Sequence, residues 1–129
     1  MLNGVKAFRM SKGTNSSKVI VIGRNMDDVR LYKKGLEAKG LKVEIFDGEV
    51  VPVAARLEFA GYKEKGIWVK DADLPNTIMY KSNQQWVEKM VADGYDIYDI
   101  GNLHALAGDG LADSWYSAFY EMEKGIVFP

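Results

Sequence analysis

Short apolar runs alternate with helical periodicities along the first half of this chain. Residues 18–23 (KVIVIG) form an apolar run closed by Gly23, which is typical of a strand buried on both faces. Apolar residues then recur three and four positions apart, which predicts a helix over 25–39 with Asn25 as its N-cap. Residues 41–46 alternate between apolar and polar, as a strand nearer a sheet edge does. Together these segments predict a βαβ unit with a right-handed crossover.

The second half of the chain continues the alternation of helices and strands. We expect a helix within 50–66 that starts at Pro52, a turn at 71–76, a helix over 77–92 and a strand over 95–101. Gly-Asp and Asp-Gly steps predict a loop over 102–113. A last helix should begin at Asp113, with an apolar line formed by Trp115, Phe119, Met122 and Ile126.

Three strands separated by helices predict an α/β fold. We expect a three-layer sandwich with a small, mostly parallel, Rossmann-like sheet whose first strand, 18–23, is central. Residues 1–17 end in SKGTNSS, which has no periodicity, so they are expected to be a flexible lead-in or linker remnant. Residues 18–129 are expected to form a single domain. The residues expected to be largely buried are Val19, Ile20, Ile22, Trp86, Ile97, Phe119 and Met122.

Composition and charge exclude several classes of function. The chain has 129 residues, of which 47% are hydrophobic and 27% charged, as in globular rather than disordered proteins. It has no cysteine, which excludes disulfides, thiolate metal sites and cysteine nucleophiles. The net charge of −1 gives no long-range attraction for polyanions, so a nucleic-acid role needs a local basic site or a partner protein. We expect no membrane-spanning segment, because no apolar run approaches about 18 residues.

The expected topology selects candidate site residues before any chemistry is considered. In open α/β sheets, ligands bind beyond the carboxyl ends of the strands, where the connections diverge. This rule selects Gly23, Arg24, Asn25, Asp47, Gly101 and Asn102. Arg24 beside a helix start would form an anion site, whereas the alternative is a tight turn with a surface arginine. The turn is not GxGxxG, which disfavours an ordinary NAD-dependent dehydrogenase.

Three further groups of residues could act on a substrate. His104, the only histidine, could transfer protons from the predicted loop or could be an ordinary surface residue. Tyr116, Tyr120 and Glu123 share one face of the last helix, where tyrosine could stack on a base and Glu123 could accept a proton. The alternative is an amphipathic helix whose tyrosines lie at its boundary. Asn83 could contact a base edge or a phosphate, but a solvated helix face is the preferred interpretation, because amides are mostly exposed.

A metal site is not expected. Four carboxylates could in principle gather around magnesium, but no spacing singles them out: Asp47, Asp99, Asp109 and Glu123. One histidine and no cysteine disfavour zinc.

Three segments of the chain share their order with a known group of proteins. They are VIVIGRNMDDV (19–29), MYKSNQQWVEKMVADGYDIYDIG (79–101) and SAFYEMEKGIVF (117–128). Together they resemble C-terminal toxin domains of polymorphic toxins, of the CdiA-type contact-dependent growth inhibition proteins and the Rhs-repeat effectors. The shared features are a strand ending in IGR, a K-N-W helix, a strand ending in DIG and a closing Y-x-M-E helix. The middle of the chain, 47–75, matches nothing in that pattern.

The resemblance implies an antibacterial effector domain. Such a domain is secreted as part of a larger bacterial surface protein, acts in the target-cell cytoplasm and is neutralised by a cognate immunity protein. These domains are most often nucleases acting on tRNA or other nucleic acid, and some use elongation factor Tu as a protein cofactor. The positions that match the pattern are Gly23, Arg24, Asn83, Trp86, Asp99, Gly101, Tyr120, Met122 and Glu123.

Three functions follow as hypotheses. The first is a metal-independent ribonuclease acting on tRNA, in which Arg24 holds the phosphate and His104 or Glu123 moves protons. Tyr120 or Tyr116 would stack on a base. The remaining substrate-binding candidates are Gly23, Asn25, Asn83, Asp99 and Asn102. The second hypothesis is an enzyme that hydrolyses a free nucleotide such as NAD in the same Rossmann-like cleft. The third is a non-catalytic partner-binding module, which would apply if the proposed site residues lie far apart.

Overall fold

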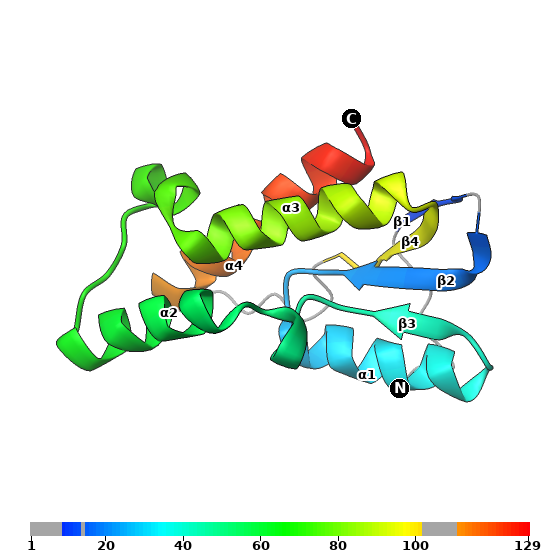
Figure 1. Ribbon diagram of the computed structural model, residues 1–129, viewed down its shortest axis with the longest axis horizontal. Coiled ribbons are helices and arrows are strands. Elements are labelled where there is room, and N and C mark those ends of the chain that lie inside the picture. Colours follow the sequence, from blue (N-terminus) through cyan, green and yellow to red (C-terminus); the bar gives the residue numbers. More distant parts are fainter. Residues whose placement is uncertain (1–8, 14, 102–110) are drawn as a thin grey trace.

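The computed structural model of the chain describes residues 9–13, 15–101 and 111–129. Within these ranges the chain is an α/β fold with four α-helices and a mixed four-stranded sheet (Figure 1). The strands are β1 (Arg9–Ser11), β2 (Asn15–Ile22), β3 (Lys42–Glu44) and β4 (Tyr95–Asp99). The helices are α1 (Met26–Ala38), α2 (Val53–Lys65), α3 (Ile78–Ala92) and α4 (Leu111–Val127). Helices therefore alternate with strands along most of the chain, as the pattern of apolar positions predicts.

The sheet has the strand order β1-β4-β2-β3. Strand β2 pairs in parallel with β3 on one side and with β4 on the other, where Ile22 lies opposite Asp99. Strand β1 pairs antiparallel with the far side of β4, which makes the sheet mixed. The interior of the sheet is therefore shared by β2 and β4. Because Ile22 and Asp99 are level, the segments that follow β2 and β4 leave the sheet side by side.

Regular secondary structure begins before Lys18. The expectation that all of residues 1–17 form a flexible lead-in is therefore wrong. Strand β1 and the start of β2 both fall within that range. The connection between them is packed on β4, where the backbone N–H of Gly13 donates to Asp96 Oδ1 at 2.6 Å. A Cβ atom on Gly13 would lie 1.9 Å from the carbonyl oxygen of Gly94, so only glycine fits there. A strand of three residues has no periodicity to reveal it in the sequence.

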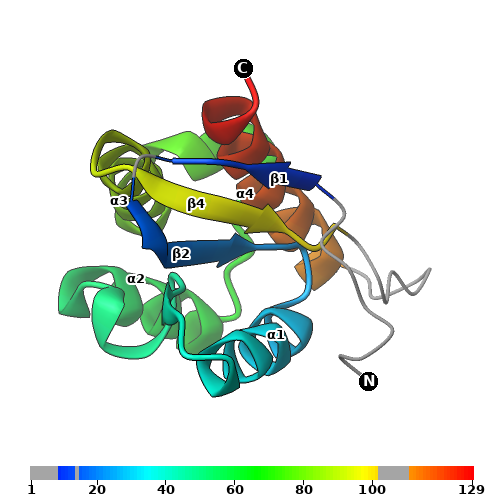
Figure 2. The ribbon, with the colours of Figure 1, turned by 90° about the vertical axis from the view of Figure 1, so that its right-hand side faces the viewer.

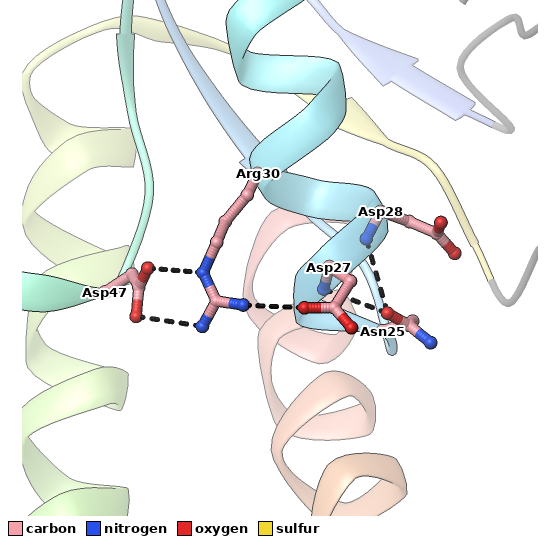
Figure 3. Close-up of polar contacts among 5 residues, drawn as sticks. All are labelled: Asn25, Asp27, Asp28, Arg30 and Asp47. Atoms are coloured by element: carbon pink, nitrogen blue, oxygen red, sulfur yellow. Dashed lines mark hydrogen bonds and ion pairs between the residues drawn. The ribbon is translucent and has the colours of Figure 1, made fainter. Parts of the chain in front are cut away.

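Helix α1 begins as the sequence predicts. The side chain of Asn25 accepts hydrogen bonds from the backbone N–H groups of Asp27, at 2.9 Å, and Asp28, at 3.3 Å (Figure 3). The N-cap is therefore confirmed. The chain leaves the helix through Gly40, whose φ of 89° lies in the left-handed region that favours glycine.

Helices cover both faces of the sheet, and each face has its own core. Helix α1 lies on one face, while α3 and α4 lie on the other (Figure 2). On the α1 face the buried residues are Val19, Val21, Val29, Tyr32, Leu36, Val43, Ile45 and Ile100. On the opposite face they are Ile20, Ile22, Val87, Met90, Tyr95, Ile97, Tyr120 and Val127. Side chains from consecutive positions of β2 point to opposite faces, which explains its continuous apolar run.

The buried face of α4 differs from the predicted one. Tyr120, Glu123 and Val127 are buried, whereas Phe119 and Met122 are only half-buried. Trp86 on α3 is also half-buried, so these three residues, which were expected to be largely buried, are less buried than Val19, Ile20, Ile22 and Ile97. The sequence pattern marked the more apolar line of α4, but that line is turned partly away from the sheet. The helix also begins at Leu111, so Asp113 lies inside it and is not its cap.

The remaining connections are short. A 3-10 helix over Gly48–Val50 precedes α2, and the turn expected at 71–76 is a 3-10 helix over Asp71–Asn76. The predicted loop 102–113 lies outside the described residues up to position 110. Among the helices of the described part, none combines the length and apolar character needed to cross a membrane.

Candidate functional site

A cavity of about 340 Å³ opens beyond the carboxyl end of β2, and residues of α1, α2, α3 and α4 contribute to its wall. Its wall is made by residues from seven segments of the chain. They are Val21, Ile22, Gly23, Arg24, Met26, Val29, Phe46, Asp47, Val51, Phe59, Met79, Asn83, Phe119, Tyr120 and Glu123. The place is the one that the strand-end rule selects, because the segments after β2 and β3 both contribute to the wall.

Gly23 and Arg24 form one end of this pocket. A Cβ atom on Gly23 would lie 2.6 Å from Cγ1 of Ile100, so glycine lets the end of β2 pass close to the segment that follows β4. The backbone N–H of Arg24 donates to the carbonyl oxygen of Gly101 at 3.1 Å. The Arg24 side chain is only 7% exposed. Arg24 is therefore not the surface arginine that the alternative interpretation, a simple tight turn, predicts.

Glu123 and Asn83 form a polar pair in the pocket wall. Both residues line the pocket and are buried, with exposures of 8% and 5%. The Asn83 side chain donates a hydrogen bond to the Glu123 carboxyl. Burial raises the pKa of Glu123 to about 8, the Asn83 hydrogen bond offsets part of this rise, and the nearby negative charge of Asp99 adds to it. At neutral pH Glu123 therefore keeps its proton in most molecules.

Asp99 lies behind the pocket wall and holds Tyr120. Its Oδ1 atom accepts hydrogen bonds from the Tyr120 hydroxyl at 2.6 Å and from the backbone N–H of Gly101 at 2.8 Å. Asp99 is completely buried, and its Oδ2 atom has no hydrogen-bond partner among the described residues. Burial, together with the hydrogen bond to Asp99, raises the pKa of Tyr120 above its ordinary range. Tyr120 therefore stays neutral and acts as a donor.

Asp47 closes the side of the pocket next to α1. Arg30 on α1 binds both of its carboxylate oxygens, at 2.7 Å and 3.3 Å, and also binds Asp27 at 2.9 Å (Figure 3). The hydrogen bond from Arg30 lowers the pKa of Asp47. Since Phe46 and Asp47 both line the pocket, this ion pair holds the segment after β3 against the start of α1.

Aromatic side chains make the apolar part of the wall. Phe59 comes from α2 and its ring lies 6.3 Å from that of Phe119 on α4. Phe119 also contacts Tyr80, at 5.7 Å between ring centroids, and Phe46 contacts Trp86 at the same separation. These contacts leave flat apolar faces beside buried polar groups, as in pockets that bind heterocyclic ligands.

The structure brings together six of the residues that the sequence selects. The pocket is lined by Gly23, Arg24, Asp47, Asn83, Tyr120 and Glu123. Asp99 does not line it but holds Tyr120, and Asn25 caps α1 rather than facing the pocket wall. His104 and Asn102 lie outside the described residues. Tyr116 falls within α4, but its side chain lies outside the described part of the chain.

Sequence reasoning missed the apolar wall. Phe59 and Val51 come from the segment 47–75, which matches nothing in the family pattern, and Met79 looks like an ordinary core position. Phe46 carries no functional signal in the sequence, because it is the last residue of the second predicted strand, whereas Asp47 is selected by its position directly after that strand. The burial of Asn83 also contradicts a solvated helix face at that position.

The described residues offer no evident metal site. In residues 9–13, 15–101 and 111–129, no group of three or more His, Asp or Glu side chains lies close enough to hold a metal ion. The buried groups of the pocket can instead bind an anion through Arg24 and transfer a proton through Glu123. Comparison of the chain with protein families, curated proteins and solved structures found no match.

Proposed function

We propose that the chain is an enzyme that hydrolyses the N-glycosidic bond of a nucleotide in this pocket. One observation carries the proposal: buried Arg24 and buried Glu123 line the same pocket. A volume of about 340 Å³ lies at the lower end of the range of small-molecule sites, roughly 300–1,000 Å³. Arg24 would bind a phosphate of the nucleotide, and the aromatic wall would accommodate its base.

The state of Glu123 supports proton donation to a leaving base. As the bond between C1′ of the ribose and the base nitrogen breaks, its electron pair goes to that nitrogen, which takes the proton of Glu123. The oxygen of a water molecule bonds to C1′, and the proton that the water loses restores Glu123. The products are the free base and the ribose phosphate. A pKa of about 8 keeps Glu123 protonated at neutral pH, as a general acid requires.

Two broader features belong to the same proposal. We propose that the sheet is Rossmann-like, since β2 is parallel to both neighbours and the pocket lies at its carboxyl end. We also propose, from the resemblance to polymorphic toxins, that the chain is an antibacterial effector domain of a larger secreted bacterial surface protein. It would act in the target-cell cytoplasm and be neutralised by an immunity protein.

A ribonuclease acting on tRNA without a metal is the second candidate. The resemblance and the position of Arg24, two residues after the end of β2, favour it, because an arginine there can bind a phosphodiester. Glu123 would then protonate the 5′-oxygen that leaves when the 2′-OH attacks phosphorus. The proton of the 2′-OH would pass to solvent, and the products would be a 2′,3′-cyclic phosphate and a 5′-hydroxyl end. In this case elongation factor Tu would present the tRNA. The apolar pocket favours the first candidate, because a phosphodiester in an RNA strand requires an open groove.

The two candidates differ in their products. The purified chain is incubated with NAD, ATP and AMP, and separately with tRNA, and the products are separated by chromatography and by gel electrophoresis. We expect free base from at least one nucleotide and intact tRNA. Cleaved tRNA with intact nucleotides would support the ribonuclease, and no product from either would support a binding module.

A variant pair assigns any product to the pocket. Glu123→Gln keeps the size and the acceptor oxygen but cannot donate the proton, so it should lose base release. Glu121→Gln is the matched control, because Glu121 lies on the same helix with 67% of its side chain exposed.

A further inference from the structure

Asn83 occupies an unusual position on α3. The buried residues of this helix are Asn83, Val87 and Met90, so an amide stands in line with two apolar core side chains. Asn83 is 5% exposed and lines the pocket. Its neighbour Gln85 lies on the exposed side of the same helix. The sequence KSNQQW therefore contains one buried amide among exposed and half-buried ones.

The two ends of the Asn83 amide have different surroundings. Its nitrogen donates to the carboxyl of Glu123. Its Oδ1 atom is buried and has no hydrogen-bond partner among the described residues. A buried acceptor without a donor is destabilising and uncommon in native proteins. A donor on a bound ligand would remove this cost.

Chemistry specifies which donor would lie there. If Glu123 gives its proton to the base at C1′, the ligand group next to it is the hydroxyl on the adjacent carbon, C2′. Asn83 and Glu123 line the same pocket, and the hydrogen bonding between them places the Asn83 amide beside the proton donor. A hydroxyl is a donor and suits an orphan carbonyl oxygen.

We infer that Asn83 Oδ1 accepts a hydrogen bond from the ribose 2′-OH of the substrate, so that the site selects ribonucleotides over 2′-deoxyribonucleotides. This inference rests on the proposed function and names the sugar of its substrate. A site built around such a hydrogen bond rejects the analogue that lacks the hydroxyl, because the acceptor is then left unpaired. Asn83 thereby acts as a specificity-determining residue.

Equilibrium binding tests the inference without the chemical step. Calorimetric titrations with ATP and with dATP are made on Glu123→Gln, in which turnover is blocked and the introduced amide oxygen can still accept from Asn83. Because dATP cannot donate the hydrogen bond to Asn83 Oδ1, we expect it to bind about 10- to 100-fold more weakly than ATP. Adding Asn83→Leu should reduce this ratio to near one, whereas adding Gln85→Leu should leave it unchanged. Circular dichroism shows whether each variant is folded.

The outcomes separate the inference from the proposed function. Tight binding of ATP with weak binding of dATP, abolished by Asn83→Leu, supports the inference. Equal binding of ATP and dATP to Glu123→Gln overturns it and leaves the proposed function standing. If neither nucleotide binds, the inference is overturned, whereas release of base from NAD or AMP would still support the proposed function. The ratio measured on Glu123→Gln decides the matter even if Asn83→Leu does not fold.

Discussion

The Tyr120 hydroxyl donates a hydrogen bond of 2.6 Å to Oδ1 of Asp99, and this contact joins α4 to the end of β4. Both residues are buried, and the same oxygen also accepts from the backbone of Gly101. Glu123 follows Tyr120 by three residues and therefore lies on the same face of the helix. The contact thus fixes where Glu123 stands in the pocket.

Removing the Tyr120 hydroxyl should lower both stability and activity. Tyr120→Phe keeps the ring but takes one donor from a buried carboxylate, and we expect a loss of roughly 1–3 kcal/mol in the free energy of unfolding. Urea denaturation measures this loss. Tyr62→Phe, on a half-buried tyrosine of α2, is the control and should change stability by less than about 0.5 kcal/mol. Equal effects of the two changes would contradict the role of the Asp99 contact.

The buried carboxyl of Glu123 should make stability depend on pH. Its pKa is raised from 4.5 to about 8 in the folded chain. Between these values the unfolded chain has lost the proton that the folded chain keeps, so the free energy of unfolding falls as pH rises. Each unit of difference corresponds to about 1.4 kcal/mol. Below pH 4.5 and above pH 8 this contribution no longer changes with pH.

Glu123→Gln removes this pH dependence. Urea denaturation at about pH 5.5, 7 and 9, which covers most of the interval between the two pKa values and extends above it, should show the variant gaining stability relative to the parent as pH rises. Glu121→Gln should follow the parent at each pH, because that side chain is exposed. A constant difference between Glu123→Gln and the parent would show that the pKa of Glu123 is not raised.

Arg24 should matter for both activity and folding. Arg24→Met keeps much of the length but not the charge, so base release should be lost. Because the side chain is buried, stability should fall by about 1 kcal/mol or more. Arg24→Lys should recover activity only in part, since an ammonium cannot reproduce a two-point contact with phosphate. Arg56→Met, at an exposed position of α2, is the control, and full activity in Arg24→Met would show that the anion site is wrong.

The close approach of Gly13 to Gly94 tests whether the segment before Lys18 packs on β4. Gly13→Ala places a Cβ atom 1.9 Å from the carbonyl oxygen of Gly94, so the chain must shift and the melting temperature should fall by several degrees. Gly61→Ala is the matched change, because Gly61 lies in α2 with open space around it. There alanine should stabilise by roughly 0.5–1 kcal/mol. Thermal unfolding followed by circular dichroism measures both.

The pattern of apolar residues was enough to predict the order of helices and strands. The run in β2 and the cap at Asn25 are local features, and local features are what periodicity and capping rules detect. Strand β1 was missed because its three residues are held by pairing with β4, which is distant in the sequence. The rotation of α4 was mispredicted for a similar reason. Hydrogen bonding of Tyr120 to Asp99 is not visible in the apolar pattern.

The candidate site was predictable only at the strand end. Arg24 follows directly from the rule that ligands bind beyond the carboxyl ends of parallel strands. The burial of Asn83 beside Glu123 could not be predicted, because an amide on a helix is exposed in most proteins. The contribution of Phe59 depends on how α2 packs against α3, which no local pattern specifies.

The central claim, that Glu123 donates a proton to the leaving base, is tested most directly by measuring base release. The measurement compares the parent chain with Glu123→Gln and with Glu121→Gln. Each protein is incubated with ATP near neutral pH, and free adenine is quantified by chromatography over time. The proposed mechanism predicts that the parent and Glu121→Gln release adenine at similar rates and that Glu123→Gln is slower by about 100-fold or more, on the order expected for loss of a general acid. Adenine release by Glu123→Gln at the rate of the parent would contradict it.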